Sequence, residues 1–290
     1  MSALTIAPTI IVTRPIGQAQ QLIAQLQTAL STAPNPIAQQ TTVLALPLLK
    51  IIPKSDFQLQ VDIPAAISQA DLVIFVSPNA IECGMRLLSA PWHELAPMQL
   101  RVGVMGESSK KSLLQHGVDS QMILLPRNPQ QLDSEGLWQT LQAEQKKHDW
   151  DWTERRVIIF KGDGGREWLA DTLLAAGAQL ETFAVYSRVP LEKSHPLWQA
   201  IQVNPRDKKL WLLTSSEAVR YLGQSDKDQV ALNLQLASAL CPHQNIATLA
   251  SEIGFGDVRL CESGDAALIK ASLQWVEELA VEVDPVKIIR

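Results

Sequence analysis

A glycine-rich segment, Lys161-Gly162-Asp163-Gly164-Gly165-Arg166, follows a short apolar run and precedes a helical pattern over residues 167–176. A turn of this kind exposes main-chain N–H groups at the positive end of a helix, which suits a carboxylate or a phosphate. The segment matches neither a Walker loop nor GxGxxG, because position 167 is Glu. We predict that Gly162, Gly164, Gly165 and Arg166 bind an anion. A turn that only closes a strand–helix unit is the alternative.

Three further turns carry serine directly after an apolar run. They read Ser77-Pro78-Asn79-Ala80, Gly106-Glu107-Ser108-Ser109 and Thr214-Ser215-Ser216-Glu217. Open α/β sheets bind ligands at the carboxyl ends of their strands. The ligand-binding candidates are therefore Ser77, Asn79, Ser109, Ser215 and Ser216. Their hydroxyls could equally cap the helices that follow. If main-chain amides are the donors, serine-to-alanine changes should cost less than about tenfold in activity.

The chain has 290 residues, of which 46% are apolar, enough for one large or two medium cores. Its 25 basic and 30 acidic residues argue against a nucleic-acid partner, which would need a basic stripe. No apolar run approaches the roughly 20 residues that cross a bilayer, and Arg14 interrupts the N-terminal run early. We therefore expect a soluble cytoplasmic monomer without membrane contact.

Cysteine and histidine do not cluster along the chain. The three cysteines form no CxxC motif, and the five histidines are scattered. In a chain without a signal peptide, such cysteines are typical of reduced thiols. We expect no metal and no cofactor.

Ten short apolar runs alternate with stretches of helical periodicity. The runs are Ile10–Thr13, Thr42–Leu46, Leu72–Val76, Val102–Met105, Met122–Leu125, Val157–Phe160, Leu180–Val185, Leu210–Leu213, Leu236–Leu240 and Val258–Cys261. Apolar strands between amphipathic helices are typical of parallel sheets covered on both faces. Ten strands are many for one such sheet, so we predict two doubly wound, flavodoxin-like sheets of about five strands.

An internal repeat supports this division. Residues 72–81 resemble residues 210–219, and residues 10–17 with their helix resemble residues 157–164 with theirs. The two halves carry these units in different order, which indicates a circular permutation. We predict lobe 1 from residues 1–46 and 191–290, with residues 47–190 inserted as lobe 2. Strands 46–53 and 182–190 would form a two-stranded ladder that acts as a hinge, with the working site in the cleft between the lobes.

Eight motifs resemble, in order, those of the uroporphyrinogen-III synthase family. They are Thr13-Arg14-Pro15, Pro47 to Pro53, Ser77 to Ala80, Gly106 to Ser109, Gly162 to Leu169, Gly177-Ala178 with Val185-Tyr186-Ser187-Arg188, Thr214-Ser215-Ser216, and His243 to Ala247 with Gly254. Each is weak alone, but together they span nearly the whole chain. Two departures are Ser109, where threonine is common, and Pro242-His243-Gln244-Asn245, where the family has His-Pro-Arg.

The resemblance implies a cofactor-free lyase of heme biosynthesis. Such an enzyme cyclises hydroxymethylbilane, a linear tetrapyrrole with eight carboxylates, and loses water while the last ring is inverted. The preceding enzyme of the pathway would be a transient partner. The resemblance adds Thr13, Arg14 and His243 to the substrate-binding candidates.

Tyr186 is the catalytic candidate that this resemblance implies. A tyrosine, with an ordinary pKa of about 10, keeps its proton at neutral pH and can assist a departing hydroxide, which an ionised carboxylate cannot. On the crossing segment its ring would point into the cleft. The alternative is a ring that only packs against one lobe.

Three other functions stay open. A two-lobed racemase would place one thiol on each side of a cleft, but Cys83 and Cys241 are not equivalent in the repeat. A solute-binding module of the periplasmic type would share the hinge but would need a signal peptide. A small-anion binding protein without turnover is the third, and a test for turnover distinguishes it.

Overall fold

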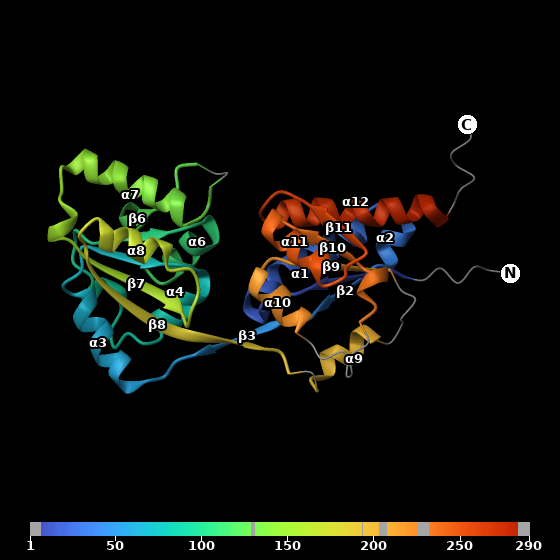
Figure 1. The fold of residues 1–290 in the computed structure, drawn as a ribbon, viewed down its shortest axis with the longest axis horizontal. Helices are drawn as coiled ribbons and strands as arrows, with labels where there is room; N and C mark the ends of the chain where they lie inside the picture. The colour runs from blue at the N-terminus through green and yellow to red at the C-terminus, as the bar shows by residue number, and fades with distance from the viewer. Residues whose placement is uncertain (1–6, 129–130, 193, 203–207, 225–231, 284–290) are drawn as a thin grey trace. The chain divides into compact units, whose positions relative to one another are not determined.

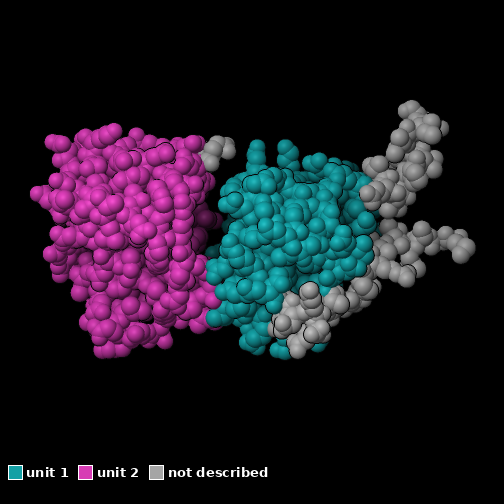
Figure 2. Space-filling model, viewed as in Figure 1, with its two compact units in different colours: residues 1–50, 189–290 teal, residues 51–188 magenta. Residues whose placement is uncertain are grey.

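The computed structural model describes residues 7–128, 131–192, 194–202, 208–224 and 232–283. The chain divides into two compact units, residues 1–50 with 189–290 and residues 51–188 (Figure 2). The sequence placed these boundaries after residues 46 and 190. The ends of the expected lobe 1, residues 1–6 and 284–290, lie outside the described residues.

Unit 1 has a parallel sheet of five strands in the order β11-β10-β9-β1-β2. Helices α1, α2 and α12 cover one face of this sheet, and α9, α10 and α11 cover the other. The elements are β1 (Thr9–Val12), α1 (Ile16–Thr32), α2 (Pro36–Gln40), β2 (Thr42–Ala45), α9 (Pro196–Gln202), β9 (Lys209–Leu212), α10 (Ser216–Gly223), β10 (Ser238–Cys241), α11 (Gln244–Glu252), β11 (Asp257–Leu260) and α12 (Asp265–Val283), with a 3-10 turn at Leu234–Leu236.

Unit 2 contains the strand order β8-β7-β4-β5-β6, also parallel, with β3 added at the edge beside β8. Helices α3 to α6 cover one face, and α7 and α8 cover the other. The elements are β3 (Leu49–Pro53), α3 (Phe57–Ile67), β4 (Leu72–Phe75), α4 (Pro78–Met85), α5 (Trp92–Leu95), β5 (Arg101–Val104), α6 (Glu107–Gln115), β6 (Ile123–Leu124), α7 (Ser134–His148), β7 (Arg156–Gly162), α8 (Trp168–Ala175) and β8 (Gln179–Pro190), with 3-10 turns at Ser120–Met122 and Trp152–Glu154.

The two sheets have the same order of equivalent strands, entered by the chain at different points. Unit 1 begins with β1 and β2 and ends with β9 to β11, whereas unit 2 runs from β4 to β8. Equivalent helices end alike, because Gly117 after α6 and Gly254 after α11 both have positive φ angles, of 78° and 101°. Glycine reaches this left-handed region without a steric penalty, so it ends a helix well.

Strands β3 and β8 carry the chain between the units (Figure 1). The Lys54 amide donates to the Val185 carbonyl at 2.9 Å, and the Leu191 amide donates to the Leu48 carbonyl at 3.0 Å. From one hydrogen bond to the other, residue numbers increase along one segment and decrease along the other. Strands β3 and β8 are therefore antiparallel. The first half of β8 pairs with β7 instead, which makes β8 a continuous strand of 12 residues.

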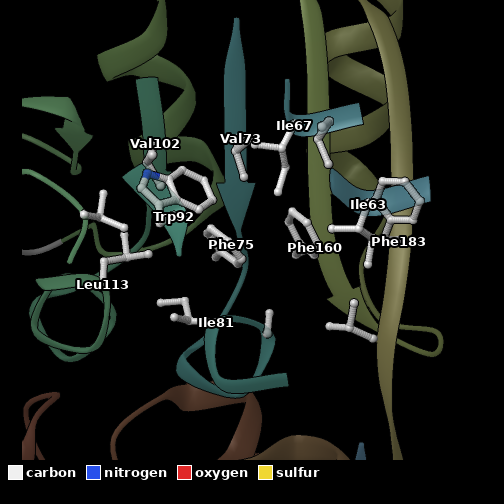
Figure 3. Packing of buried hydrophobic residues seen from close by; sticks show 14 of the residues in the cluster. Ile63, Ile67, Val73, Phe75, Ile81, Trp92, Val102, Leu113, Phe160 and Phe183 are labelled. Carbon is white, nitrogen blue, oxygen red and sulfur yellow. The ribbon is translucent and has the colours of Figure 1, made fainter. Parts of the chain in front are cut away.

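The core of unit 2 fixes the strands that precede its polar turns. Phe75 and Phe160, on the neighbouring strands β4 and β7, stack with ring centroids 4.7 Å apart, and Phe183 lies beyond Phe160 (Figure 3). Aromatic pairs of this kind add to the free energy gained from buried area. The carboxyl ends of β4, β7 and β8 are thus held in fixed register directly below the turns.

Candidate active site

The polar turns of unit 2 follow parallel strands and so meet at one edge of its sheet. Ser77 follows β4, Gly106 follows β5, and the glycine-rich turn follows β7. Helices α4, α6 and α8 begin at these turns, so several main-chain N–H groups lie at this edge. The edge is electrostatically suited to an anion without needing free basic side chains.

The glycine-rich turn has two residues in the left-handed region. Gly164 has a φ of 67° and Gly165 a φ of 100°. An L side chain would be strained at either position. The glycines therefore set the path of the turn and expose its main chain.

Each charged side chain of this turn has a partner inside unit 2. Lys161 pairs with Glu167, and Lys54 Nζ lies 2.6 Å from Asp163 Oδ1. Arg166 binds Glu135 through two contacts, one of them 2.9 Å long. The Arg166 bond lowers the pKa of the Glu135 carboxyl. Arg166 is therefore already neutralised, which favours the main chain of the turn as the anion donor.

Asp163 ties the turn to the two crossing strands. Besides Lys54 of the β3 side, Ser187 of β8 donates to Asp163 Oδ2 at 2.5 Å. These two bonds, with Lys54 as the larger cause, hold the pKa of Asp163 below its ordinary value. The Asp163 amide donates to the Tyr186 carbonyl at 2.8 Å. The same residue thus fixes both the turn and the strand that carries the tyrosine.

A β-bulge aims the side chain of Tyr186. Lys161 pairs with Ala184, but Gly162 pairs with Tyr186, so Val185 is an extra residue on β8. Without the bulge, consecutive side chains would point to opposite faces. Here Val185 and Tyr186 both lie in the core on the α3–α6 face of the sheet. The sequence did not reveal the bulge.

The Tyr186 hydroxyl ends at the carboxyl edge of β4. It lies 3.2 Å from Ser77 Oγ, and Arg188 Nη1 donates to it at 3.4 Å. Its ring packs over Gly162, where a Cβ would lie only 2.6 Å from Tyr186 Cε2. The ring of Tyr186 is 1% exposed and packs within unit 2, as in the alternative that the sequence left open. Gly162 receives this ring, a role that differs from the predicted ligand contact.

In unit 1, Thr13 and Arg14 have structural partners. Thr13 Oγ1 donates to the Leu212 carbonyl at 2.6 Å and is 3% exposed, so it joins β1 to β9. Arg14 Nη1 lies 2.6 Å from Asp265 Oδ1, and its Nε donates to Thr214 Oγ1 at 3.4 Å. Arg14 therefore ties together the turns after β1 and β9 and the start of α12.

The remaining candidates of unit 1 lie at helix starts. Ser215 Oγ accepts from the Ala218 amide at 3.3 Å and caps α10, of which Ser216 is the first residue. His243 precedes α11, and its Nε2 lies 3.4 Å from Ser263 Oγ. The strand order places the turns after β1, β9 and β10 at one edge of the unit 1 sheet.

Asn79 and Ser109 differ in accessibility. Asn79 lies in the first turn of α4 and is partly exposed. Ser109 faces inward from α6 and is only 4% exposed, so its hydroxyl is not available as the structure stands. The N–H groups at the start of α6 lie at the edge, so they are the groups of this turn that remain available to a ligand.

Four charged partners were missed from the sequence: Lys54, Glu135, Asp163 and Asp265. Lys54 and Asp163 are 109 residues apart, and Arg14 and Asp265 are 251 apart. No local spacing signals such pairs. Only Asp163 lay within a motif that the sequence had singled out.

Metal ligation and membrane insertion find no support in the described part of the chain. Among those residues, no group of three or more His, Cys, Asp or Glu side chains is close enough to hold a metal ion. None of the described helices combines the length and the apolar character needed to cross a bilayer.

The fold and its polar edges define a class: proteins with two α/β units, one inserted into the other, in which polar turns follow parallel strands. The profile of the family described as uroporphyrinogen-III synthase HemD matches residues 33–267. The chain belongs to the uroporphyrinogen-III synthase family, which acts in the biosynthesis of tetrapyrroles such as heme.

Two relatives are named uroporphyrinogen-III synthase, and two similar solved structures are named as a synthase and a synthetase of uroporphyrinogen III. The uroporphyrinogen-III synthase of Escherichia coli (strain K12) is 26% identical over 277 residues, which cover 92% of this chain and 100% of the relative. That of Salmonella typhimurium (strain LT2) is 24% identical over the same shares. A mutant enzyme from Thermus thermophilus superposes with a TM-score of 0.55 at 13% identity, over 94% of this chain and 99% of that one. The Helicobacter pylori 26695 enzyme gives 0.55 at 12%, over 92% and 99%. At these identities the two structures support the fold alone.

Proposed function

We propose that this chain cyclises hydroxymethylbilane to uroporphyrinogen III, with inversion of the last ring and loss of water. This makes it a lyase that needs no cofactor. The reaction breaks a C–O bond and forms and rearranges C–C bonds without a net change in oxidation state, so proton donors and binding groups suffice.

The observation that carries this proposal is the Tyr186 hydroxyl at the edge of the unit 2 sheet. It lies 3.2 Å from Ser77 Oγ, at the start of α4. A neutral phenol supplies a proton to a departing hydroxide, and general-acid help of this kind is worth about 10²–10⁴ in rate. Tyr186 is the proton source in this proposal.

Main-chain amides at the turns are proposed to bind the substrate carboxylates. The glycines at 164 and 165 expose the main chain, and the internal pairing of Arg166 leaves that main chain as the donor. The turns at Ser77, Asn79, Ser215, Ser216 and His243 contribute the same kind of group. Amides at helix starts bind anions even where the net charge of the protein is −5.

In this proposal, the orientation of the bound substrate supplies most of the selectivity for isomer III over isomer I. Hydroxymethylbilane also cyclises unaided, to isomer I, so the enzyme must hold the bent chain in the geometry that inverts the last ring. Holding two reacting ends together is worth up to about 7–11 kcal/mol of the barrier. The proton donor then accelerates the departure of hydroxide within that geometry.

A coupled assay tests the proposal. Hydroxymethylbilane is generated in place, the products are oxidised, and isomers I and III are separated by chromatography. We expect isomer III to dominate with the protein and isomer I without it. Binding of the substrate with only isomer I as product would contradict the proposal and favour a binding protein without turnover.

A further inference from the structure

The Ser77 hydroxyl has contacts on two sides that constrain its own hydrogen. Its Oγ accepts from the Ala80 amide at 3.2 Å, and the same atom lies 3.2 Å from the Tyr186 hydroxyl. The Tyr186 oxygen in turn accepts from Arg188 Nη1. A serine hydroxyl has one hydrogen and two lone pairs. If Tyr186 donates, both lone pairs of Ser77 are used and its hydrogen is left for another acceptor.

Burial decides which of the two hydroxyls reaches a substrate. Tyr186 is 1% exposed, whereas Ser77 is only partly buried at the turn after β4. On the proposed function, the buried phenol would need a carrier to deliver its proton. We propose that Ser77 is a catalytic residue that donates its proton to the leaving hydroxyl of the substrate, while Tyr186 reprotonates Ser77.

The relay balances in protons and electrons. The lone pair of the terminal pyrrole nitrogen expels the hydroxyl, and the C–O bond breaks. The Ser77 proton joins the departing oxygen to give water, and the Tyr186 proton moves to Ser77 Oγ. The phenolate oxygen that results lies 3.4 Å from Arg188 Nη1, whose positive charge stabilises it. After ring closure, the proton lost from the attacked ring carbon returns through Ser77 to Tyr186.

Ser215 shows what a serine at this position does without a tyrosine. It caps α10 through the Ala218 amide at 3.3 Å, much as Ser77 caps α4. Both serines precede equivalent helices in the two sheets. The Tyr186 contact is the additional feature of Ser77, so a cap role alone does not explain it.

Four variants, compared with Tyr186→Phe, test the relay in the coupled assay. Ser77→Ala should lower the rate of isomer III formation at least about 100-fold, close to the loss in Tyr186→Phe and well beyond the roughly tenfold limit expected for a serine whose turn only binds a carboxylate through its main chain. Ser77→Thr keeps a hydroxyl and should stay within about tenfold of the parent protein. Asn35→Ala, the control, removes the cap bond that Asn35 Oδ1 accepts from the Ile37 amide at 2.9 Å, outside the proposed site, and should leave the rate close to that of the parent protein. The double variant with Ser77→Ala and Tyr186→Phe should be no slower than the slower single variant.

The outcomes separate the relay from the proposed function. Absence of isomer III with the parent protein overturns the function. If the parent makes isomer III and Ser77→Ala keeps more than about a third of the rate while Tyr186→Phe does not, Tyr186 acts directly and the relay is wrong. Losses that multiply in the double variant also overturn it.

The hydrogen bond between Ser77 and Tyr186 can also be tested by a measurement that does not depend on turnover. The chain has two tyrosines, so protein labelled with ¹³C at tyrosine Cζ gives two signals, and Tyr186→Phe assigns them. Ser77→Ala should shift the Tyr186 signal and leave that of Tyr221 in place. An unmoved Tyr186 signal would contradict the contact on which the relay depends.

Discussion

The two units are built on one strand order, yet they use equivalent turns differently. In unit 2 the strand beside β7 contains a bulge, and the bulge brings Tyr186 to Ser77. In unit 1 the equivalent pair, β1 and β2, stays in regular register from Thr9 to Val12. The turn after β1 begins its helix directly behind Pro15, whereas the turn after β7 needs two left-handed glycines.

The charged side chains at the polar turns also have different partners in the two units. Arg14 of unit 1 binds Asp265 and Thr214, and so links three turns of one sheet edge. The charged residues of the glycine-rich turn in unit 2 pair around an exposed main chain. The comparison indicates that a shared scaffold supplies helix starts in both units, while one residue inserted in β8 places a tyrosine hydroxyl beside such a helix start in unit 2.

The largest effect should come from Tyr186→Phe. The change keeps the ring and its packing over Gly162 but removes the hydroxyl, so isomer III formation should fall at least about 100-fold. Thermal unfolding should stay close to that of the parent. The coupled assay and a melting curve measure both. A variant with more than about half of the parent rate would make Tyr186 a structural residue.

Gly162→Ala and Gly17→Ala form a matched pair across the units. A Cβ at 162 would lie 2.6 Å from the Tyr186 ring, whereas a Cβ at 17 meets nothing within 4 Å. Overpacking of this kind costs about 1–3 kcal/mol and should displace the hydroxyl, with at least about a tenfold loss of activity. Gly17→Ala, in the first turn of α1, should be neutral or up to about 1 kcal/mol more stable. Urea unfolding compares them, and equal effects would refute the tight contact.

Asp163→Asn tests the tie between the turn and β8. Its carboxylate is stabilised by Lys54 and Ser187, so its pKa is lowered and its contribution to stability is present above the ordinary value of about 3.9. That contribution is lost as the pH falls through the lower pKa of the folded state. The melting difference between parent and variant should therefore be present at pH 7, begin to shrink below about pH 4, and vanish only once the pH falls below the lowered pKa of the folded state.

Asp71, at the other end of β7, is a control for Asp163, because it is also a carboxylate that accepts hydrogen bonds from a basic side chain. Asp71 accepts from Arg155 Nη1 at 3.0 Å and from the Arg156 amide at 2.9 Å, at the amino end of the strand. Asp71→Asn should lower stability but not kcat. Asp163→Asn should lower kcat by a few-fold because Tyr186 loses its fixed position. Equal kcat in both variants would contradict a positioning role.

Much of the fold could be predicted because parallel strands carry a local signal. Buried on both faces, they appear as apolar runs, and the runs at Leu72–Val76 and Leu210–Leu213 lie within one residue of β4 and β9. Two doubly wound parallel sheets were predicted and confirmed. The helices that follow the two related segments, α1 and α8, each bury two leucines: Leu22 and Leu26, and Leu169 and Leu173.

The site was predicted less completely, for a physical reason. Motifs place Ser77 at a strand end and Tyr186 on a crossing strand, but which way a side chain points depends on register. One extra residue at Val185 turns the tyrosine into the core, and no residue type marks that bulge. Ion pairs such as Lys54 with Asp163 depend on the folded path of the chain, so their partners could not be predicted from spacing.

The smallest predicted effect is on the labelling rates of the cysteine thiols. Each thiol reports on the opening of the unit in which it lies. Burial raises the pKa of Cys241 in unit 1 to about 12, with a smaller effect from Cys261, and burial also raises the pKa of Cys83 in unit 2. Because the thiolate is the reactive form, neither should react with a disulfide reagent at pH 8 until its unit opens. Gly162→Ala, if it costs about 1–3 kcal/mol, should speed labelling of Cys83 by roughly 5- to 150-fold. Cys241 should react at the parent rate, as mass spectrometry of the labelled peptides would measure. Equal acceleration at both cysteines would mean that the two units unfold together, and that the difference between them is one of chemistry and not of stability.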